Sequence, residues 1–199
     1  MPGQTQNVSD LAVELAQRLP EALIGERIIP RFVDSYVVEH GRHALQVHAS
    51  LYRDRLALLQ REALLALTVL AFTNACTEIP ASKKAKPRVM SQKDLATFRR
   101  KFLTVLARQQ KWTVGDAMDF QTDLQIYEQL IRRNSATRRA RKSFEVANHP
   151  FVDRCAFLLD SSFMEKARFA ASRALGDLED LATHVMASAS EPKIVSNPR

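Results

Sequence analysis

Arginine and lysine side chains, which bind phosphate groups, are concentrated in the middle of this chain. Residues 79–142 hold 16 basic and 5 acidic side chains, a net charge of +11, whereas residues 1–78 and 143–199 each carry −2. The whole positive excess of a 199-residue chain with a net charge of +7 therefore lies in its middle third. The candidate residues for binding an acidic partner are Lys83, Lys84, Lys86, Arg88, Arg99, Arg100, Arg132, Arg133, Arg138, Arg139, Arg141 and Lys142.

These cations form three groups along the chain. The first lies in a loop predicted over residues 79–90, which contains two prolines. The third fills residues 132–142 with six cations and no acid. At about 100° per residue, those six side chains would point all around a helix and leave no face to bury, so the segment is predicted to be a solvated helical extension or a mobile arm. The second group lies between them, on the polar side of the helix predicted after Ser91, and consists of Arg99, Arg100, Lys101 and Arg108.

The basic middle third predicts contact with a nucleic-acid backbone. Each phosphate that a cation neutralises releases counterions, and this gain needs no precise geometry. Arginine predominates in residues 132–142 and favours bidentate phosphate contacts, while the absence of aromatic residues there disfavours stacking on bases. A helix-turn-helix over residues 169–185 is rejected, because Glu179 falls where an apolar side chain is needed. Contact is therefore expected with the backbone rather than with base edges.

Other interpretations of the same pattern stay open. A solvated surface that only keeps the protein soluble would explain the charge equally well. A protein–protein adaptor or structural assembly subunit that acts through amphipathic helices is the first alternative function, and a metal-dependent helical-bundle protein is the second. The preferred hypothesis is a non-enzymatic helical binding protein whose middle third contacts an acidic partner, either a nucleic acid or an acidic protein surface.

Three aspartates form the most regular acidic pattern. Asp116, Asp119 and Asp123 follow one another at spacings of three and four residues, on one helix face beside Tyr127. Three carboxylates placed in this way could hold Mg²⁺. The alternatives are a solvated flank near the positive helix N-terminus, or a face on which the basic segments of another copy dock. The last alternative predicts a homo-oligomer.

Three histidines lie close together in the first quarter of the chain. They are His40, His43 and His48, with Glu39 four residues before His43. A carboxylate beside a histidine at helical spacing ligates metal in helical bundles when a second helix supplies a matching Glu-x-x-His. The chain contains no such match, so we expect neither a metal nor a cofactor.

No motif typical of an enzyme is present. The chain lacks G-x-x-x-x-G-K, G-x-G-x-x-G and G-x-S-x-G, and its five glycines are too scattered to build a phosphate-binding loop. Nothing places a nucleophile beside a base, so no catalytic residue is predicted and the protein is not expected to be an enzyme. Cys76 and Cys155 fall in apolar helical patterns and are predicted to be buried thiols, although a long-range disulfide between them stays open.

The elements that must position these residues are predicted to be helices. Hydrophobic residues make up 46% of the chain and charged residues 26%, as in globular proteins. Glycine and proline leave long intervals with helical rather than alternating periodicity, and no segment has the pattern of a strand. We predict an all-α bundle of six or seven helices around one long central helix over residues 42–78, without a β-sheet. That helix has an apolar stripe formed by Leu45, Tyr52, Leu56, Leu59, Ala63, Leu67 and Leu70.

Several residues predict where the other helices begin and end. Ser9, Pro30 and Asn148 are expected near helix starts, and Ser91 with Asp94 and Thr113 with Asp116 resemble capping boxes. Pro20 should kink or end the first helix, and Gly176 with Asp177 should separate a last short helix. We predict a single domain over residues 1–187 and a flexible C-terminal tail over 188–199.

The chain is expected to be soluble and cytoplasmic. Its first ten residues are polar and show no signal-peptide pattern. The longest uncharged apolar stretch, residues 63–77, falls short of the roughly 20 residues that a membrane-spanning helix needs, and it suits a buried core helix better. No membrane span is therefore predicted.

Overall fold

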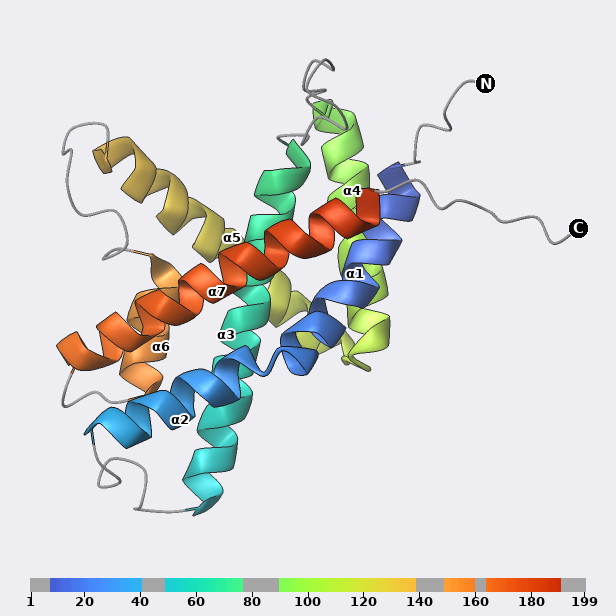
Figure 1. Cartoon of the computed structure of the whole chain (residues 1–199). Helices are drawn as coiled ribbons and strands as arrows, with labels where there is room; N and C mark the ends of the chain where they lie inside the picture. The colour runs from blue at the N-terminus through green and yellow to red at the C-terminus, as the bar shows by residue number, and fades with distance from the viewer. Residues whose placement is uncertain (1–7, 41–48, 77–89, 139–148, 160–163, 191–199) are drawn as a thin grey trace, which may run out of the picture.

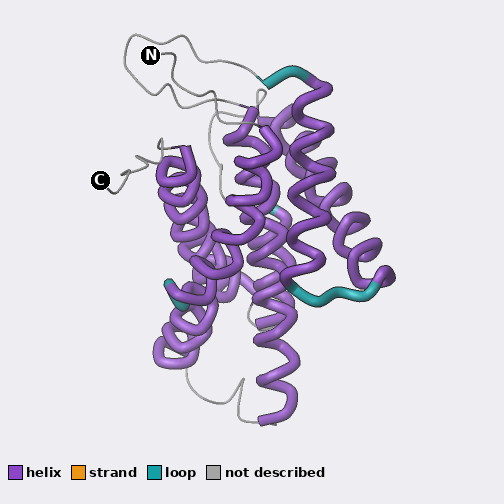
Figure 2. Tube along the Cα trace, turned by 90° about the vertical axis from the view of Figure 1, so that its right-hand side faces the viewer, coloured by secondary structure: helices purple, strands orange, loops and turns teal. Residues whose placement is uncertain are grey.

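The computed structural model describes residues 8–40, 49–76, 90–138, 149–159 and 164–190, which form seven α-helices (Figure 2). No strand is present in these ranges, so the predicted all-α class is confirmed. The helices are α1 (Val8–Gly25), α2 (Ile28–His40), α3 (Ala49–Cys76), α4 (Gln92–Gln109), α5 (Val114–Arg138), α6 (Pro150–Leu159) and α7 (Met164–Ser190).

Helix α3 is the centre of the bundle, as the sequence predicts. It contacts each of the other helices, and α7 lies across it (Figure 1). Every residue from Glu62 to Val69 is buried, so this part of α3 is covered on all sides. The predicted central helix is confirmed over 49–76; positions 42–48, 77 and 78 lie outside the described residues.

The same helix is apolar enough to cross a membrane by length and composition alone. The segment Asp54–Ala75 has a mean hydropathy of 1.5. This is weak evidence for a span, because the core helix of a soluble protein passes the same test. In this bundle, 61% of the apolar window is buried inside the protein.

Side-chain caps fix the start of three helices. Ser91 accepts a hydrogen bond from the Asp94 backbone N–H at 3.1 Å, which confirms the predicted cap of α4. At α5 the Asp116 N–H donates to Thr113 Oγ1 at 3.1 Å, and the Thr113 N–H donates to the Asp116 carboxylate at 2.9 Å, a reciprocal capping box. For α6 the cap is His149, whose Nδ1 accepts from the Phe151 N–H at 3.2 Å; the predicted Asn148 lies outside the described residues.

Two predicted helix breaks are wrong. Helix α1 does not end at Pro20 but continues to Gly25, and α7 runs without interruption through Gly176. In both cases the flanking residues belong to the core, including Leu19 and Leu23 in α1 and Leu175 in α7. Packing of an amphipathic face supplies most of a helix's stability, so it outweighs the local cost of one proline or glycine.

The predicted tail also begins too early. Helix α7 reaches Ser190, and Ala189 is buried. The Ser188 hydroxyl accepts a hydrogen bond from Arg18 Nη1 on α1 at 3.0 Å. These contacts with the bundle hold the last turn of α7 in helical form.

Substituting Gly176→Ala should stabilise the protein. An added Cβ would meet no atom within 4 Å, and the residue sits in the middle of α7. Alanine reduces the conformational entropy of the unfolded chain, so the free energy of unfolding should rise by about 0.5–1 kcal/mol. The measurement is urea unfolding, in which the midpoint should rise while the m-value stays constant.

Gly25→Ala is the matched control, because its Cβ would also meet no atom within 4 Å but the residue is the last of α1. Its free energy of unfolding should rise less than that of Gly176→Ala. A lower midpoint for Gly176→Ala would show that the helix needs glycine at this position.

Candidate functional site

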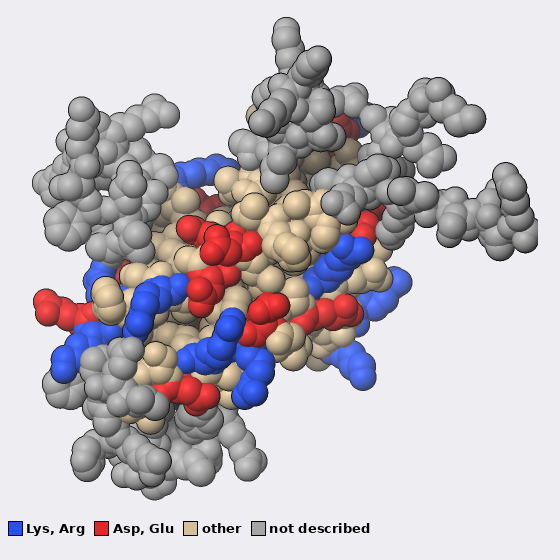
Figure 3. Space-filling view, in the orientation of Figure 1, with Lys and Arg blue, Asp and Glu red and all other residues tan. Residues whose placement is uncertain are grey.

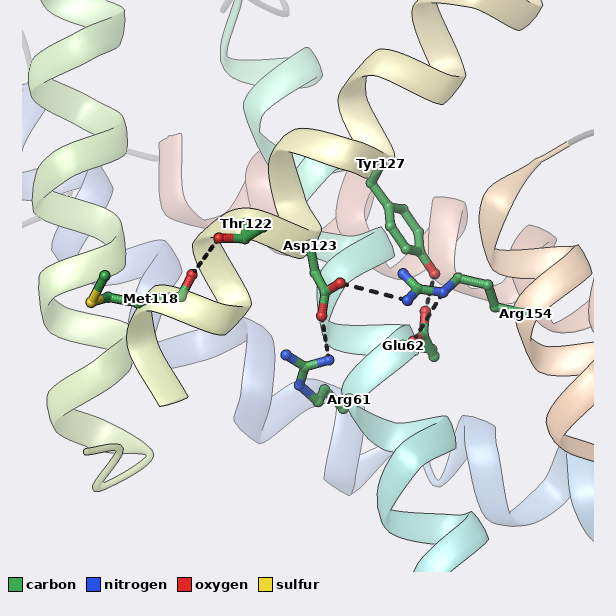
Figure 4. Close-up of polar contacts among 7 residues, drawn as sticks. All are labelled: Arg61, Glu62, Met118, Thr122, Asp123, Tyr127 and Arg154. Atoms are coloured by element: carbon green, nitrogen blue, oxygen red, sulfur yellow. Dashed lines mark hydrogen bonds and ion pairs between the residues drawn. The ribbon is translucent and has the colours of Figure 1, made fainter. Parts of the chain in front are cut away.

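A buried carboxylate lies at the middle of the bundle. Glu62 of α3 is 6% exposed, and its Oε2 accepts a hydrogen bond from the phenol of Tyr127 on α5, which is fully buried. Arg154 of α6 places its Nε 3.5 Å from Glu62 Oε1. One carboxylate therefore joins three helices (Figure 4).

Asp123, one turn before Tyr127 on α5, extends this arrangement to a second arginine. Its Oδ2 lies 2.5 Å from Arg61 Nη1, and its Oδ1 lies 3.5 Å from Arg154 Nη2, so the carboxylate stands between two guanidinium groups (Figure 4). The Arg154 guanidinium also lies 5.4 Å from the centroid of the Tyr127 ring. We call Arg61, Glu62, Asp123, Tyr127 and Arg154 the Glu62 cluster.

Burial dominates the protonation chemistry of this cluster. It raises the pKa of Glu62, while the Tyr127 hydrogen bond and the charge of Arg154 act in the opposite direction. Burial and the neighbouring carboxylate also raise the pKa of Tyr127, so the phenol keeps its proton and acts as a donor. Cys155 is a buried free thiol, as predicted, and burial raises its pKa as well. The side chain of Cys76 is not among those described.

The arrangement suits a structural role better than a catalytic one. Each charged group of the Glu62 cluster is paired with another member, and Glu62 and Tyr127 are closed to solvent. With their pKa values raised, the Tyr127 phenol and the Cys155 thiol keep their protons, so they supply neither a phenolate base nor a thiolate nucleophile. What the cluster does is fix α3, α5 and α6 relative to one another.

Sequence reasoning missed this cluster. Glu62 immediately precedes the apolar stretch of residues 63–77, and Tyr127 was placed only beside the three aspartates of the acidic pattern. The available signal was a carboxylate inside a helix that becomes apolar on all sides, because a buried charge needs a partner. The partner phenol is 65 positions away in sequence, which no local pattern reveals.

The three predicted aspartates line one open hollow of the surface but are not grouped closely enough to hold a metal ion. Asp116 is taken by the capping box, and the two hydrogen bonds from Thr113 lower its pKa. Asp123 belongs to the Glu62 cluster, and Asp119 is exposed. The described part of the chain contains no group of three or more His, Cys, Asp or Glu side chains that could hold a metal ion. His43 and His48 lie outside that part, and the His40 side chain is not described.

The structure covers only part of the predicted basic site. Arg132 is exposed on α5. Arg99 is engaged elsewhere: its Nη2 lies 2.6 Å from Glu128 Oε1 on α5, and its guanidinium lies 5.0 Å from the centroid of the Phe72 ring. Arg133 and Arg138 lie on α5, but their side chains are not described. Outside the described residues are Lys83, Lys84, Lys86, Arg88, Arg139, Arg141 and Lys142.

Helix α4 carries the clearest basic surface of the described chain. Arg100 is exposed there together with three other cations, and exposed Lys111 follows just after the helix; no ion pair joins any of the five to a carboxylate of the described residues. The four that lie within the helix fall within about 100° of its circumference, on one side with Thr97 and Thr104. We call these five residues the α4 basic row: Lys93, Arg100, Lys101, Arg108 and Lys111.

Charges of opposite sign are mixed on the face of the molecule that α7 crosses (Figure 3). On the face crossed by α7, Lys and Arg alternate with Asp and Glu and form no patch of a single sign (Figure 3). Two ion pairs of the described chain are Arg168 Nη2 with Asp153 Oδ1 at 3.0 Å and Arg18 Nη2 with Glu14 Oε1 at 2.7 Å. The α4 basic row differs because several cations without carboxylate partners in the described chain lie together there.

Comparison with known proteins finds no family model, no curated protein and no solved structure that matches this chain. The candidate sites are therefore argued from their geometry and charge alone.

Substituting Tyr127→Phe should destabilise the protein more at high pH than at low pH. The raised pKa of Glu62 means that its contribution to stability is fully present below 4.5 and is lost as pH rises through the native value. The phenol opposes that loss by donating to the carboxylate. Without it, the free energy of unfolding should fall by about 1–3 kcal/mol once Glu62 is ionised, and by less while it is protonated. Urea unfolding of both proteins, measured from below pH 4.5 to above the native pKa of Glu62, gives the difference in the free energy of unfolding.

The control for this prediction is the same substitution in a Glu62→Gln background. There the loss should be smaller and independent of pH, since the titrating partner is gone. Equal, pH-independent losses in both backgrounds would show that the phenol acts only by filling space.

Proposed function

We propose that this protein is a non-enzymatic helical binding protein whose basic middle third contacts the phosphate backbone of a nucleic acid. The observation that carries the proposal is the α4 basic row. Exposed cations without carboxylate partners in the described chain are free to neutralise phosphates, whereas the paired cations of the other helices are not.

The geometry of α4 supports contact with a backbone rather than with bases. Its cations extend along the helix on one side, so they present a line of charge to a linear polyanion. Thr97 and Thr104 lie among them, and both hydroxyls already donate to backbone carbonyls of their own helix, at 3.0 and 2.8 Å. The row contains no aromatic side chain that could stack on a base, so recognition rests on charge.

Binding should weaken steeply with salt, and the α4 basic row should account for part of the slope. If each of three removed cations contacts one phosphate, Arg100→Gln/Lys101→Gln/Arg108→Gln should reduce the slope of log affinity against log salt by about 3 for duplex DNA. Fluorescence anisotropy with a mixed-sequence DNA duplex, measured at several salt concentrations, gives both slopes.

The matched control removes three exposed or ion-paired cations from other helices: Arg31→Gln/Lys166→Gln/Arg173→Gln. It changes the net charge equally but should leave the slope near that of the unmodified protein. Equal slopes for the two triple variants would remove α4 from the interface, and no binding at low salt would end the proposal. Neutralising Arg138, Arg139 and Arg141 tests the predicted arm separately.

An assembly subunit is the second candidate function, and an exposed apolar row on α5 favours it. Val114 is 80% exposed and Met118 63%, and Ile126 and Leu130 follow on the same ridge at multiples of four residues. Ridges with this spacing interdigitate when two helices pack against each other. The start of α5 is acidic at Asp116 and Asp119 and its end is basic, so two antiparallel copies would place opposite charges together.

A second copy of this chain is therefore the expected occupant of the α5 row. Met118→Glu/Ile126→Glu should convert the oligomer to a monomer, because burying two carboxylates without partners is costly. Static light scattering at low and high salt measures the mass, and an apolar interface should survive the high-salt condition.

The control places the same charges on two exposed phenylalanines away from α5, as Phe157→Glu/Phe169→Glu. That variant should keep the mass of the unmodified protein. A monomeric unmodified protein, or dissociation by the control alone, would contradict assembly through α5.

A further inference from the structure

A cavity of about 500 Å³ opens between the α1–α2 turn, the first half of α3 and the α4–α5 turn. Its size falls within the range of sites that take small organic molecules. Most of its lining is apolar: Pro20, Leu23, Ile24, Ile29, Pro30, Ala57, Leu64 and Trp112. It shares no lining residue with the α4 basic row or with the exposed ridge of α5.

The polar groups of this cavity are all amides or cations. They are Gln60, Gln110, Arg27 and Arg61, and no carboxylate lines the cavity. Arg61 is already paired with Asp123 at 2.5 Å. The Arg27 side chain is exposed and forms no ion pair within the described chain, so its guanidinium is available to a ligand.

The backbone of Arg27 is in the left-handed conformation, which is higher in energy for a residue with a side chain than for glycine. Its φ is 51°, in the left-handed region, where a non-glycine residue costs roughly 1–2 kcal/mol. The turn is fixed by hydrogen bonds on both sides, from the Arg27 N–H to the Ile24 carbonyl at 3.1 Å and from the Arg31 N–H to the Arg27 carbonyl at 2.9 Å. Glycine would adopt this backbone conformation at lower energy, and the two hydrogen bonds fix the Arg27 backbone at the edge of the cavity.

We propose that the cavity binds a small molecule with an apolar chain and one anionic group, and that Arg27 pairs with the anion. The apolar walls would bury the chain, and the absence of a lining carboxylate removes repulsion against a negative charge. A saturated medium-chain carboxylate has this chemistry. The proposal is independent of nucleic-acid binding, since the two surfaces use different residues.

Trp112 makes the proposal directly measurable. It is the only tryptophan of the chain, and it lines the cavity half-buried, with its ring centroid 4.6 Å from that of Phe120. A ligand that enters the cavity replaces water next to the indole. Tryptophan fluorescence therefore reports on this one site without a label.

The experiment is a fluorescence titration of the full chain with decanoate, decan-1-ol and decylamine. Decanoate should bind most tightly and decylamine most weakly. Arg27→Gln should weaken decanoate binding about tenfold, the effect of losing one charge-assisted hydrogen bond, and should leave decan-1-ol binding unchanged. Arg31→Gln, an exposed arginine outside the cavity, is the matched control and should leave decanoate binding unchanged.

A second variant tests the cavity itself. Ala57→Leu adds apolar volume at an exposed helical position of the lining, so it should abolish binding of both decanoate and decan-1-ol without lowering the urea midpoint. Binding retained by this variant would overturn the cavity as the site. Equal affinities for decanoate and decylamine, or no effect of Arg27→Gln, would overturn recognition of an anion.

Discussion

The constraint on which the structure depends is the burial of α3 on every side. A helix that contacts all the other helices has no solvated face along its middle, so any polar residue there must find partners within the protein. Two such residues lie there: the Thr68 hydroxyl donates to the Leu64 carbonyl of its own helix at 2.8 Å, whereas Glu62 needs partners from other helices. The phenol of Tyr127 and the guanidinium of Arg154 satisfy it, and by doing so they fix the positions of α5 and α6.

This constraint separates two kinds of charge in the protein. The charges near the core are paired: Asp123 joins Arg61 and Arg154, and Glu128 joins Arg99. Their work is to hold helices together. The cations along the outer side of α4 form no such ion pairs in the described chain, and they are the ones for which we propose an external acidic partner.

The unassigned surfaces divide in the same way by chemistry. The α4 basic row offers charge without apolar area, whereas the ridge on α5 offers apolar area, and the cavity combines apolar walls with one available arginine. Binding to a polyanion depends on charge, binding to a second copy depends on apolar area, and binding of a small amphiphile depends on both. Salt should therefore affect the first role, a carboxylate introduced on α5 the second, and a side chain that fills the cavity the third.

The sequence by itself determined the class and most of the local structure. Helical periodicity gave the all-α fold and the central helix, and the spacing of serine, threonine and aspartate gave the caps of α4 and α5, because these features depend on residues within one turn. It also located the excess positive charge.

Only the tertiary structure decided whether Pro20 and Gly176 break their helices, because that balance depends on packing with distant residues. Only the fold brought Tyr127 and Arg154 to Glu62. It also paired Arg99 with Glu128 while it left the neighbouring Arg100 exposed. The cavity beside Trp112 likewise forms only in the folded protein. Each of these depends on contacts between helices far apart in the chain, which no local pattern encodes.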